Sequence, residues 1–210
     1  MQHPLPNPIE SERLLLRPIT AEDLPVFIEM HQHAEVTAFL GGDGSPRSPE
    51  KTQTWFNVVQ GWYKKDGVGP FAIVLRDTGQ VIGRSGISFF EVELVPSMTN
   101  GRCRATAGKG SMTPGTDFKR VLEVGYVVHP SKWGHGYATE AAKSWYRYSF
   151  QERCENALYS LIHEDNLASI RVAEKNGLRR SEKIWNLDGR DFFPYKITPE
   201  EWSIRNRSQD

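Results

Sequence analysis

The stretch "YVVHPSKWGHGYATEAAKSWY", residues 126–146, decides the fold because a β-like run, two glycines and a helix-like run follow one another in it. A helix N-terminus leaves its first backbone N–H groups without partners and carries a partial positive charge. Small residues at Gly134, Gly136 and Ala138 would let a phosphate group approach those N–H groups. Two glycines would equally serve a tight strand-to-helix turn, so both interpretations stay open at this point.

Two nucleotide-binding patterns compete for the same stretch. The phosphate loop of nucleoside triphosphatases, GxxxxGK followed by Ser or Thr, is absent from the sequence. The dinucleotide-binding fingerprint matches this stretch better than the phosphate loop does, since Gly134 and Gly136 follow a strand and open a helix. It fails at the third position, Thr139, and "HPSKW" separates the strand from the glycines. A dinucleotide-binding oxidoreductase remains a rival, and it predicts a parallel sheet.

Composition narrows the class of protein. The chain of 210 residues has 26 basic and 26 acidic side chains, which gives no general electrostatic reason to bind nucleic acid or an anionic membrane. No apolar run is long enough to span a bilayer, and the first residues lack the basic-then-apolar order of a signal peptide. Cys103 and Cys154 fit no metal-type spacing, and two free thiols are expected. We expect one cytoplasmic domain spanning residues 1–210.

Hairpins on either side of a strand–helix–strand–helix run predict a mixed α+β fold. One hairpin is expected at residues 71–90 around a turn at 77–80, and a second at residues 181–197. Residues 95–119 are rich in Gly, Ser, Thr and Arg without apolar periodicity, so we expect a long, mobile loop there.

Capping residues mark three predicted helix starts: Thr20 with Asp23, Ser48 with Pro49, and Asn166. The helix after Ser48 has an apolar stripe at helical spacing, consisting of Trp55, Val58, Val59 and Trp62.

"WGHGYATEA" resembles the pyrophosphate-binding segment of the GNAT N-acetyltransferases, with the pattern Gln/Arg-x-x-Gly-x-Gly/Ala on Trp133, Gly136 and Ala138. The tryptophan departs from the usual Gln or Arg, and is similar to the ribosomal-protein-alanine acetyltransferase branch. Four blocks resemble that branch in order, and the second contains this segment: "SERLLLRPITAEDLPVF", "LEVGYVVHPSKWGHGYATEAA", "NLASIRVAEKNGLRR" and "FFPYKITPEEW". Together they are spread along the chain from residue 11 to residue 202, with residues 95–119 between the first block and the second.

The resemblance implies a twisted, mostly antiparallel mixed sheet flanked by helices, with the fourth and fifth strands splayed apart. The pantetheine arm of acetyl-CoA would lie between those strands and bond to the backbone of the fourth, residues 121–128. The implied cofactor-binding residues are Val127, Val128, Trp133, Gly134, His135, Gly136, Tyr137, Ala138, Thr139 and Asn166.

The implied reaction is direct attack of a primary amine on the acetyl thioester, the amine being a protein N-terminus or a small molecule. Glu123 is the candidate general base, because it alternates onto the strand face of Gly125 and Val127. A solvated carboxylate and a water-relayed proton remain alternatives. The resemblance places Ser169 near the leaving thiolate, one helical turn from Asn166.

Partners and metals are less constrained. His31 and His33 lie at a helix end, where the helix dipole would favour their charge, and no metal ligands are expected. The expected partner is an amine acceptor, without nucleic acid or membrane, for a monomer or homodimer. A non-catalytic acyl-CoA-binding or regulatory domain of the same fold is the alternative function.

Overall fold

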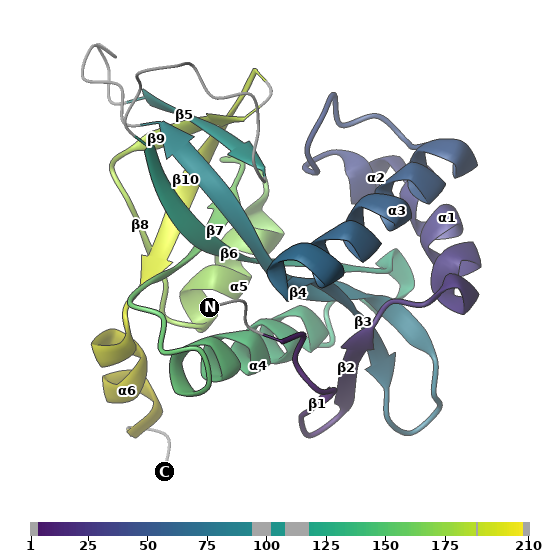
Figure 1. Cartoon of the computed structure of the whole chain (residues 1–210), viewed down its shortest axis with the longest axis horizontal. Helices are drawn as coiled ribbons and strands as arrows, with labels where there is room; N and C mark the ends of the chain where they lie inside the picture. Colours follow the sequence, from purple (N-terminus) through teal and green to yellow (C-terminus); the bar gives the residue numbers. More distant parts are fainter. Residues whose placement is uncertain (1–3, 94–101, 108–117, 188, 208–210) are drawn as a thin grey trace. The chain divides into compact units, whose positions relative to one another are not determined.

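The computed structural model describes residues 4–93, 102–107, 118–187 and 189–207 (Figure 1). The chain divides into two compact units, one of Met1–Ile87 with Gly125–Trp145 and the other of Ser88–Val124 with Tyr146–Asp210. Strands β4 (Val81–Glu93) and β6 (Phe118–Val128) and helix α4 (Tyr137–Gln151) contribute residues to both units.

The first unit contains the start of β4, the end of β6 and the start of α4. Its own elements are β1 (Ile9–Glu10), β2 (Leu14–Pro18), the 3₁₀ turn η1 (Ala21–Asp23), α1 (Leu24–Gln32), α2 (Ala34–Thr37), α3 (Pro49–Asp66), β3 (Gly69–Leu75) and the 3₁₀ turn η2 (Pro130–Lys132). Strands β1 to β4 pair antiparallel in chain order, and β4 also pairs with β6. The hairpin predicted between residues 71 and 90 is therefore confirmed.

The predicted capping residues lie at the starts of these elements, although the turn after Thr20 is the 3₁₀ turn η1 and α1 begins only at Leu24. Ser48 Oγ accepts a hydrogen bond from the Lys51 backbone N–H, and Pro49 opens α3. The carboxylate of Asp23 accepts from the Thr20 backbone N–H at 2.9 Å and from both terminal nitrogens of Arg17.

The core of the first unit lies between α1 and the sheet. Strand β3 is buried along its whole length, and α1 and α3 pack against each other (Figure 1). One buried cluster consists of Ile19, Phe27, Met30, Ala72 and Val74. Of the stripe predicted on α3, Val59 is fully buried, whereas Val58 is 45% exposed, so its assignment to the stripe was wrong. The polar side chain of Thr52 is buried on this helix, because its hydroxyl contacts the ring nitrogen of buried His31.

The second unit contains the end of β4, the start of β6 and the end of α4. Its own elements are β5 (Arg102–Ala107), β7 (Leu158–Ile162), α5 (Leu167–Lys175), β8 (Arg179–Arg180), β9 (Ile184–Leu187), β10 (Arg190–Ile197) and α6 (Pro199–Arg207). Strand β10 pairs antiparallel with β7, β8 and β9, which confirms the second hairpin. The pairings β5–β9 and β6–β7 are parallel, the latter at Glu123 opposite Tyr159.

This mostly antiparallel mixed sheet with flanking helices is the predicted α+β fold. The predicted loop needs two corrections. Arg102–Ala107 forms β5, paired with β4 and β9, and Phe118 and Lys119 already belong to β6. Strand pairing uses backbone groups, so it does not require the apolar periodicity that this segment lacks. Residues 95–101 and 108–117 of that predicted loop lie outside the described residues. Among the helices that are described, none has the length and apolar character needed to cross a membrane.

Candidate functional site

The last residues of β6 turn their backbone groups alternately to two edges. The N–H of His129 donates to the carbonyl of Ile82 on β4 at 2.8 Å, and Ser85 Oγ donates to the carbonyl of Gly125 at 2.9 Å. Odd-numbered residues of this segment therefore face β4, and by alternation Val127 does so too. A side chain on Gly83 would collide with the Val127 carbonyl, in agreement with this direction.

Of the two valines predicted to bond to the cofactor, Val128 has its backbone groups on the edge away from β4. Tyr126 shares that edge, since it has the same parity as Val128. Sequence reasoning missed Tyr126, although the period of two along a strand was a signal that could have found it.

The loop between β6 and α4 has an open backbone. Gly134 and Gly136 have φ angles of 80° and 81°, in the left-handed region that glycine adopts without steric cost. The Gly136 carbonyl accepts from the N–H of Glu140 at 3.1 Å, so Gly136 begins the hydrogen bonding of α4. A Cβ on Gly134 would meet nothing within 4 Å, and one on Gly136 only Arg13 Nη2 at 3.6 Å. This open space at a helix N-terminus fits an approaching phosphate group.

Aromatic side chains hold the loop in place. The indole Nε1 of Trp133 donates to the carbonyl of Val128 at 2.6 Å, although 49% of the tryptophan is exposed. His135 Nδ1 lies 2.8 Å from the Trp133 carbonyl, so Nδ1 carries a proton. The His135 ring stacks on Tyr137 with 5.7 Å between centroids. Ala138 and Thr139 follow in the first turn of α4, both half-buried.

Arg13 is a further residue of this site that sequence reasoning missed. Its guanidinium donates to the His135 carbonyl at 3.0 Å, lies 4.7 Å from the Tyr137 ring centroid and pairs with Glu140 at 2.7 Å. Burial raises the pKa of Glu140, but hydrogen bonds from the Arg13 backbone, Ser11 and the guanidinium outweigh it and lower that pKa. Glu140 is therefore a fixed anion that orients Arg13 beside the loop. No local pattern joins residues so distant in sequence.

Asn166 and Ser169 open α5 in the second unit. The side-chain oxygen of Asn166 accepts from the Ser169 backbone N–H at 3.1 Å, which confirms the predicted cap. Both side chains are half-buried. The amide nitrogen of Asn166 is thus oriented by a bond that the oxygen of the same side chain makes.

Glu123 also belongs to the second unit. Its Oε1 lies 3.4 Å from the backbone nitrogen of Leu161 on β7, and the side chain is half-buried. In the same unit, Tyr146 Oη lies 3.1 Å from Ser160 Oγ, which donates to the Val124 carbonyl at 2.7 Å. Burial, with a contribution from Glu123, raises the pKa of Tyr146, so its hydroxyl stays protonated.

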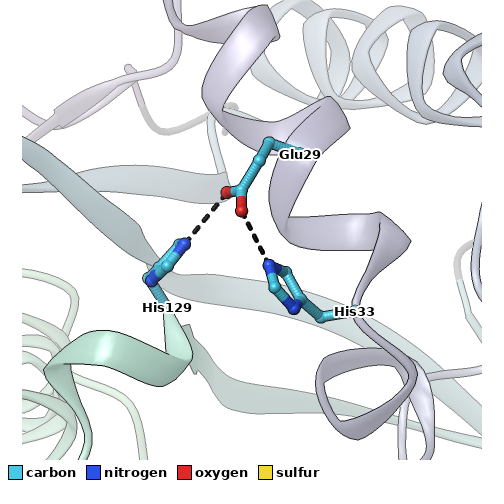
Figure 2. Close-up of side chains that lie close together, drawn as sticks. All are labelled: Glu29, His33 and His129. Carbon is cyan, nitrogen blue, oxygen red and sulfur yellow. Dashed lines mark hydrogen bonds and ion pairs between the residues drawn. The ribbon is translucent and has the colours of Figure 1, made fainter.

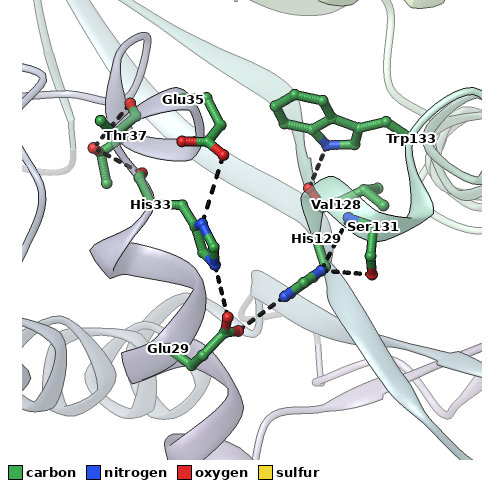
Figure 3. A network of polar contacts seen from close by, with 9 residues as sticks. Glu29, His33, Glu35, Thr37, Val128, His129, Ser131 and Trp133 are labelled. Carbon is green, nitrogen blue, oxygen red and sulfur yellow. Dashed lines mark hydrogen bonds and ion pairs between the residues drawn. The ribbon is translucent and has the colours of Figure 1, made fainter.

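A polar cluster in the first unit joins α1 to the residue that follows β6 (Figure 2). One carboxylate oxygen of Glu29 lies 2.7 Å from His33 Nε2, and the other lies 2.9 Å from His129 Nε2. The remaining ring nitrogens have outer partners: His33 Nδ1 lies 3.5 Å from Glu35, and His129 Nδ1 lies 2.8 Å from Ser131 Oγ (Figure 3). The hydrogen bond to Glu29 is the main cause that raises the pKa of His33, and the bond from His33 is the main cause that lowers the pKa of Glu29.

His31 requires a correction. The prediction that it interacts as a cation with the helix dipole is wrong, because the side chain is fully buried, with Nδ1 at 3.1 Å from Thr52 Oγ1. Burial, together with Arg84 and Arg47, lowers the pKa of His31 to about 3. The imidazole is therefore neutral, and its contact with Trp55 is that of a core side chain.

The family model for an acetyltransferase (GNAT) domain matches residues 13–179. The protein YkkB of Bacillus subtilis is 32% identical over 142 residues, which are 67% of this chain and 69% of YkkB.

Solved structures share the fold. An acetyltransferase from Agrobacterium tumefaciens aligns with a TM-score of 0.67 at 24% identity, over 91% of this chain and 94% of that one. RimJ of Mycobacterium smegmatis, in complex with CoA-disulfide, aligns with a TM-score of 0.68 at 17% identity, over 96% of this chain and 91% of RimJ.

Proposed function

We propose that this chain, which belongs to the GNAT acetyltransferase family, transfers the acetyl group of acetyl-CoA to a primary amine by direct attack. The acceptor is a protein N-terminus or a small-molecule amine. The proposal rests chiefly on one observation: Gly134 and Gly136 leave the backbone open where α4 begins. This is the arrangement that a pyrophosphate group needs in order to bond directly to helix N–H groups.

For the cofactor, we assign the pyrophosphate to residues 133–139, with Arg13 adding positive charge beside it. Val128 supplies backbone groups for the pantetheine arm, and Tyr126 supplies more on the same edge; Val127 remains a weaker candidate because its backbone faces β4. Asn166 holds the arm through its amide nitrogen while its oxygen caps α5. The CoA-disulfide complex of RimJ supports a CoA-type ligand on this fold.

For the chemistry, the neutral amine nitrogen attacks the thioester carbonyl carbon and forms the new C–N bond. Glu123 accepts the proton that the nitrogen loses, directly or through water. The tetrahedral intermediate then collapses, the C–S bond breaks, and the departing thiolate receives a proton from the Ser169 hydroxyl. Solvent returns a proton to Ser169 and takes the one that Glu123 accepted. The products are the N-acetylated amine and CoA with a free thiol.

A binding measurement followed by an activity screen tests this proposal. Calorimetric titration should show that acetyl-CoA binds and that NAD does not. A panel of amines, including peptide N-termini and polyamines, should then give acetyl-CoA-dependent release of free thiol. Binding without turnover of any amine would favour the non-catalytic acyl-CoA-binding domain, and binding of NAD in place of acetyl-CoA would overturn the proposal.

A further inference from the structure

We propose that Glu29, His33 and His129 form a binding site for a divalent transition-metal ion of the zinc type. The site is separate from the residues assigned to acetyl transfer. The three residues contribute one carboxylate and two imidazoles, and their ligand atoms all lie within 4.8 Å of one another. A carboxylate with two histidines is an established ligand set for zinc, and imidazole favours zinc over magnesium or calcium.

The directions of the side chains match this use. Both histidines present Nε2 to the same carboxylate, at 2.7 Å for His33 and 2.9 Å for His129 (Figure 2). A zinc ion lies about 2.0–2.2 Å from each ligand, which places tetrahedral ligand atoms about 3–4 Å apart. The ion would replace the protons that now join Glu29 to the two rings. Small rotations of partly exposed side chains would close the remaining distance between the two nitrogens.

Each imidazole also has a polar group beside its other ring nitrogen. Metal-bound histidines usually donate the other ring N–H to a carboxylate, hydroxyl or carbonyl group, which fixes the tautomer. His33 Nδ1 has Glu35 at 3.5 Å, and His129 Nδ1 has Ser131 Oγ at 2.8 Å (Figure 3). The backbone N–H of Ser131 also donates to His129 Nδ1 at 3.2 Å, so without metal His129 carries its proton on Nε2, facing Glu29. Metal binding would move this proton to Nδ1, where Ser131 Oγ can accept it, and would leave both Nε2 lone pairs for the ion. The cluster therefore has three metal ligands, and polar groups of Glu35 and Ser131 lie beside the nitrogens of the two imidazoles that would not bind the ion.

Access and position are also suitable. Glu29 is 53% exposed, His33 35% and His129 24%, so an ion can enter from solvent. Three protein ligands leave a coordination position for water. Glu29 and His33 lie one turn apart at the end of α1, and His129 directly follows Val128. A bound ion would thus fix α1 to the start of the loop that leads to Trp133.

The test uses the full chain in which both cysteines are replaced by serine, so that thiols cannot bind the metal. After removal of metal with a chelator, zinc chloride is titrated by calorimetry. We expect one equivalent to bind, and at least about a hundredfold weaker binding in Glu29→Gln, His33→Gln and His129→Gln. His163→Gln is the matched control, since His163 lies 3.6 Å from Asp165 in the second unit and should leave zinc affinity unchanged. Cobalt in place of zinc should give the visible absorption of a site with nitrogen and oxygen ligands.

Variants of the outer partners keep the proposal testable if a ligand variant folds poorly. Glu35→Gln and Ser131→Ala should bind zinc about tenfold more weakly while unfolding at the parent temperature in metal-free buffer. Zinc in excess should raise the unfolding temperature of the parent protein but not that of His129→Gln. The proposal would be overturned if the parent protein bound no zinc. It would also be overturned if the His33→Gln and His129→Gln variants bound zinc as tightly as the parent.

Discussion

Arg13 donates hydrogen bonds to Glu140 from both its backbone and its side chain. The backbone N–H donates to Oε1 at 2.8 Å, and Nε donates to Oε2 at 2.7 Å. The residues lie 127 positions apart, yet the contact sets the guanidinium against the carbonyl of His135 and the ring of Tyr137. Arg13 therefore supports the loop and places a cation beside it.

Replacing Arg13 should weaken acetyl-CoA binding more than it weakens the fold. Arg13→Met should bind acetyl-CoA about tenfold more weakly, and Arg13→Lys should fall between it and the parent, because lysine keeps the charge but loses the planar fork. The free energy of unfolding should change by no more than about 1 kcal/mol, since the pair is partly exposed. Arg76→Met is the control, because Arg76 is similarly exposed in an ion pair with Glu10. Parent-like affinity in Arg13→Met would remove Arg13 from the site.

Substitutions at Gly136 should separate the effect of charge from that of bulk. Asn and Asp both tolerate left-handed backbone and have the same shape. We expect acetyl-CoA affinity to fall about tenfold in Gly136→Asn and at least about a hundredfold in Gly136→Asp, whose carboxylate repels phosphate. Calorimetric titration and circular dichroism measure binding and folding. Equal affinities in a folded Gly136→Asp protein and the parent would place the pyrophosphate elsewhere.

Glu123→Gln should test the assignment of the general base. The side chain keeps its shape but no longer accepts a proton, so kcat should fall about a hundredfold or more with acetyl-CoA affinity little changed. Ser169→Ala should lower kcat by a smaller factor than Glu123→Gln does. The decrease should be greatest for acceptors whose reaction is limited by departure of the thiolate. The exposed Glu152 at the end of α4 provides the control variant Glu152→Gln. Undiminished turnover in Glu123→Gln would move the base to another residue.

Asp23 should make the fold sensitive to acid. Burial raises the pKa of Asp23, but the hydrogen bonds from Arg17 and Thr20 outweigh it, so the net pKa is lowered. The stability that this carboxylate contributes is therefore complete above its unfolded pKa of about 4, and is lost as the pH falls through the lower folded value.

Asp23→Asn should accordingly lower the free energy of unfolding by about 2 kcal/mol at pH 7 and reduce its decline in acid. Urea unfolding at several pH values measures both effects. Asp77→Asn, in the exposed turn between β3 and β4, serves as the comparison. An unchanged acid decline in Asp23→Asn would assign the pH dependence to other carboxylates.

The sequence predicted the features that short segments determine. Ser48 and Asn166 cap their helices as expected, because a cap needs only residues within one turn. The contact of Arg13 with Glu140 could not be predicted, since it depends on how distant segments pack. The cluster of Glu29, His33 and His129 could not be predicted for the same reason, since its members lie at the end of α1 and directly after β6.

Packing also overrode local patterns. Helical spacing placed Val58 in the apolar stripe of α3, but the spacing does not determine how much of the stripe the rest of the unit buries. Val58 lies outside the buried part. Strand β5 formed in a polar segment because β4 and β9 offered backbone partners.

The alternation of backbone groups in β6 limits how this segment can change during evolution. Insertion or deletion of one residue between Gly125 and Val128 would reverse the edge of the strand to which each following backbone group points. The carbonyl that accepts from Trp133 would then turn toward β4. A change of two residues would restore the directions. Homologous chains should therefore tolerate length differences in the loop after His129 more readily than a one-residue difference in the strand before it.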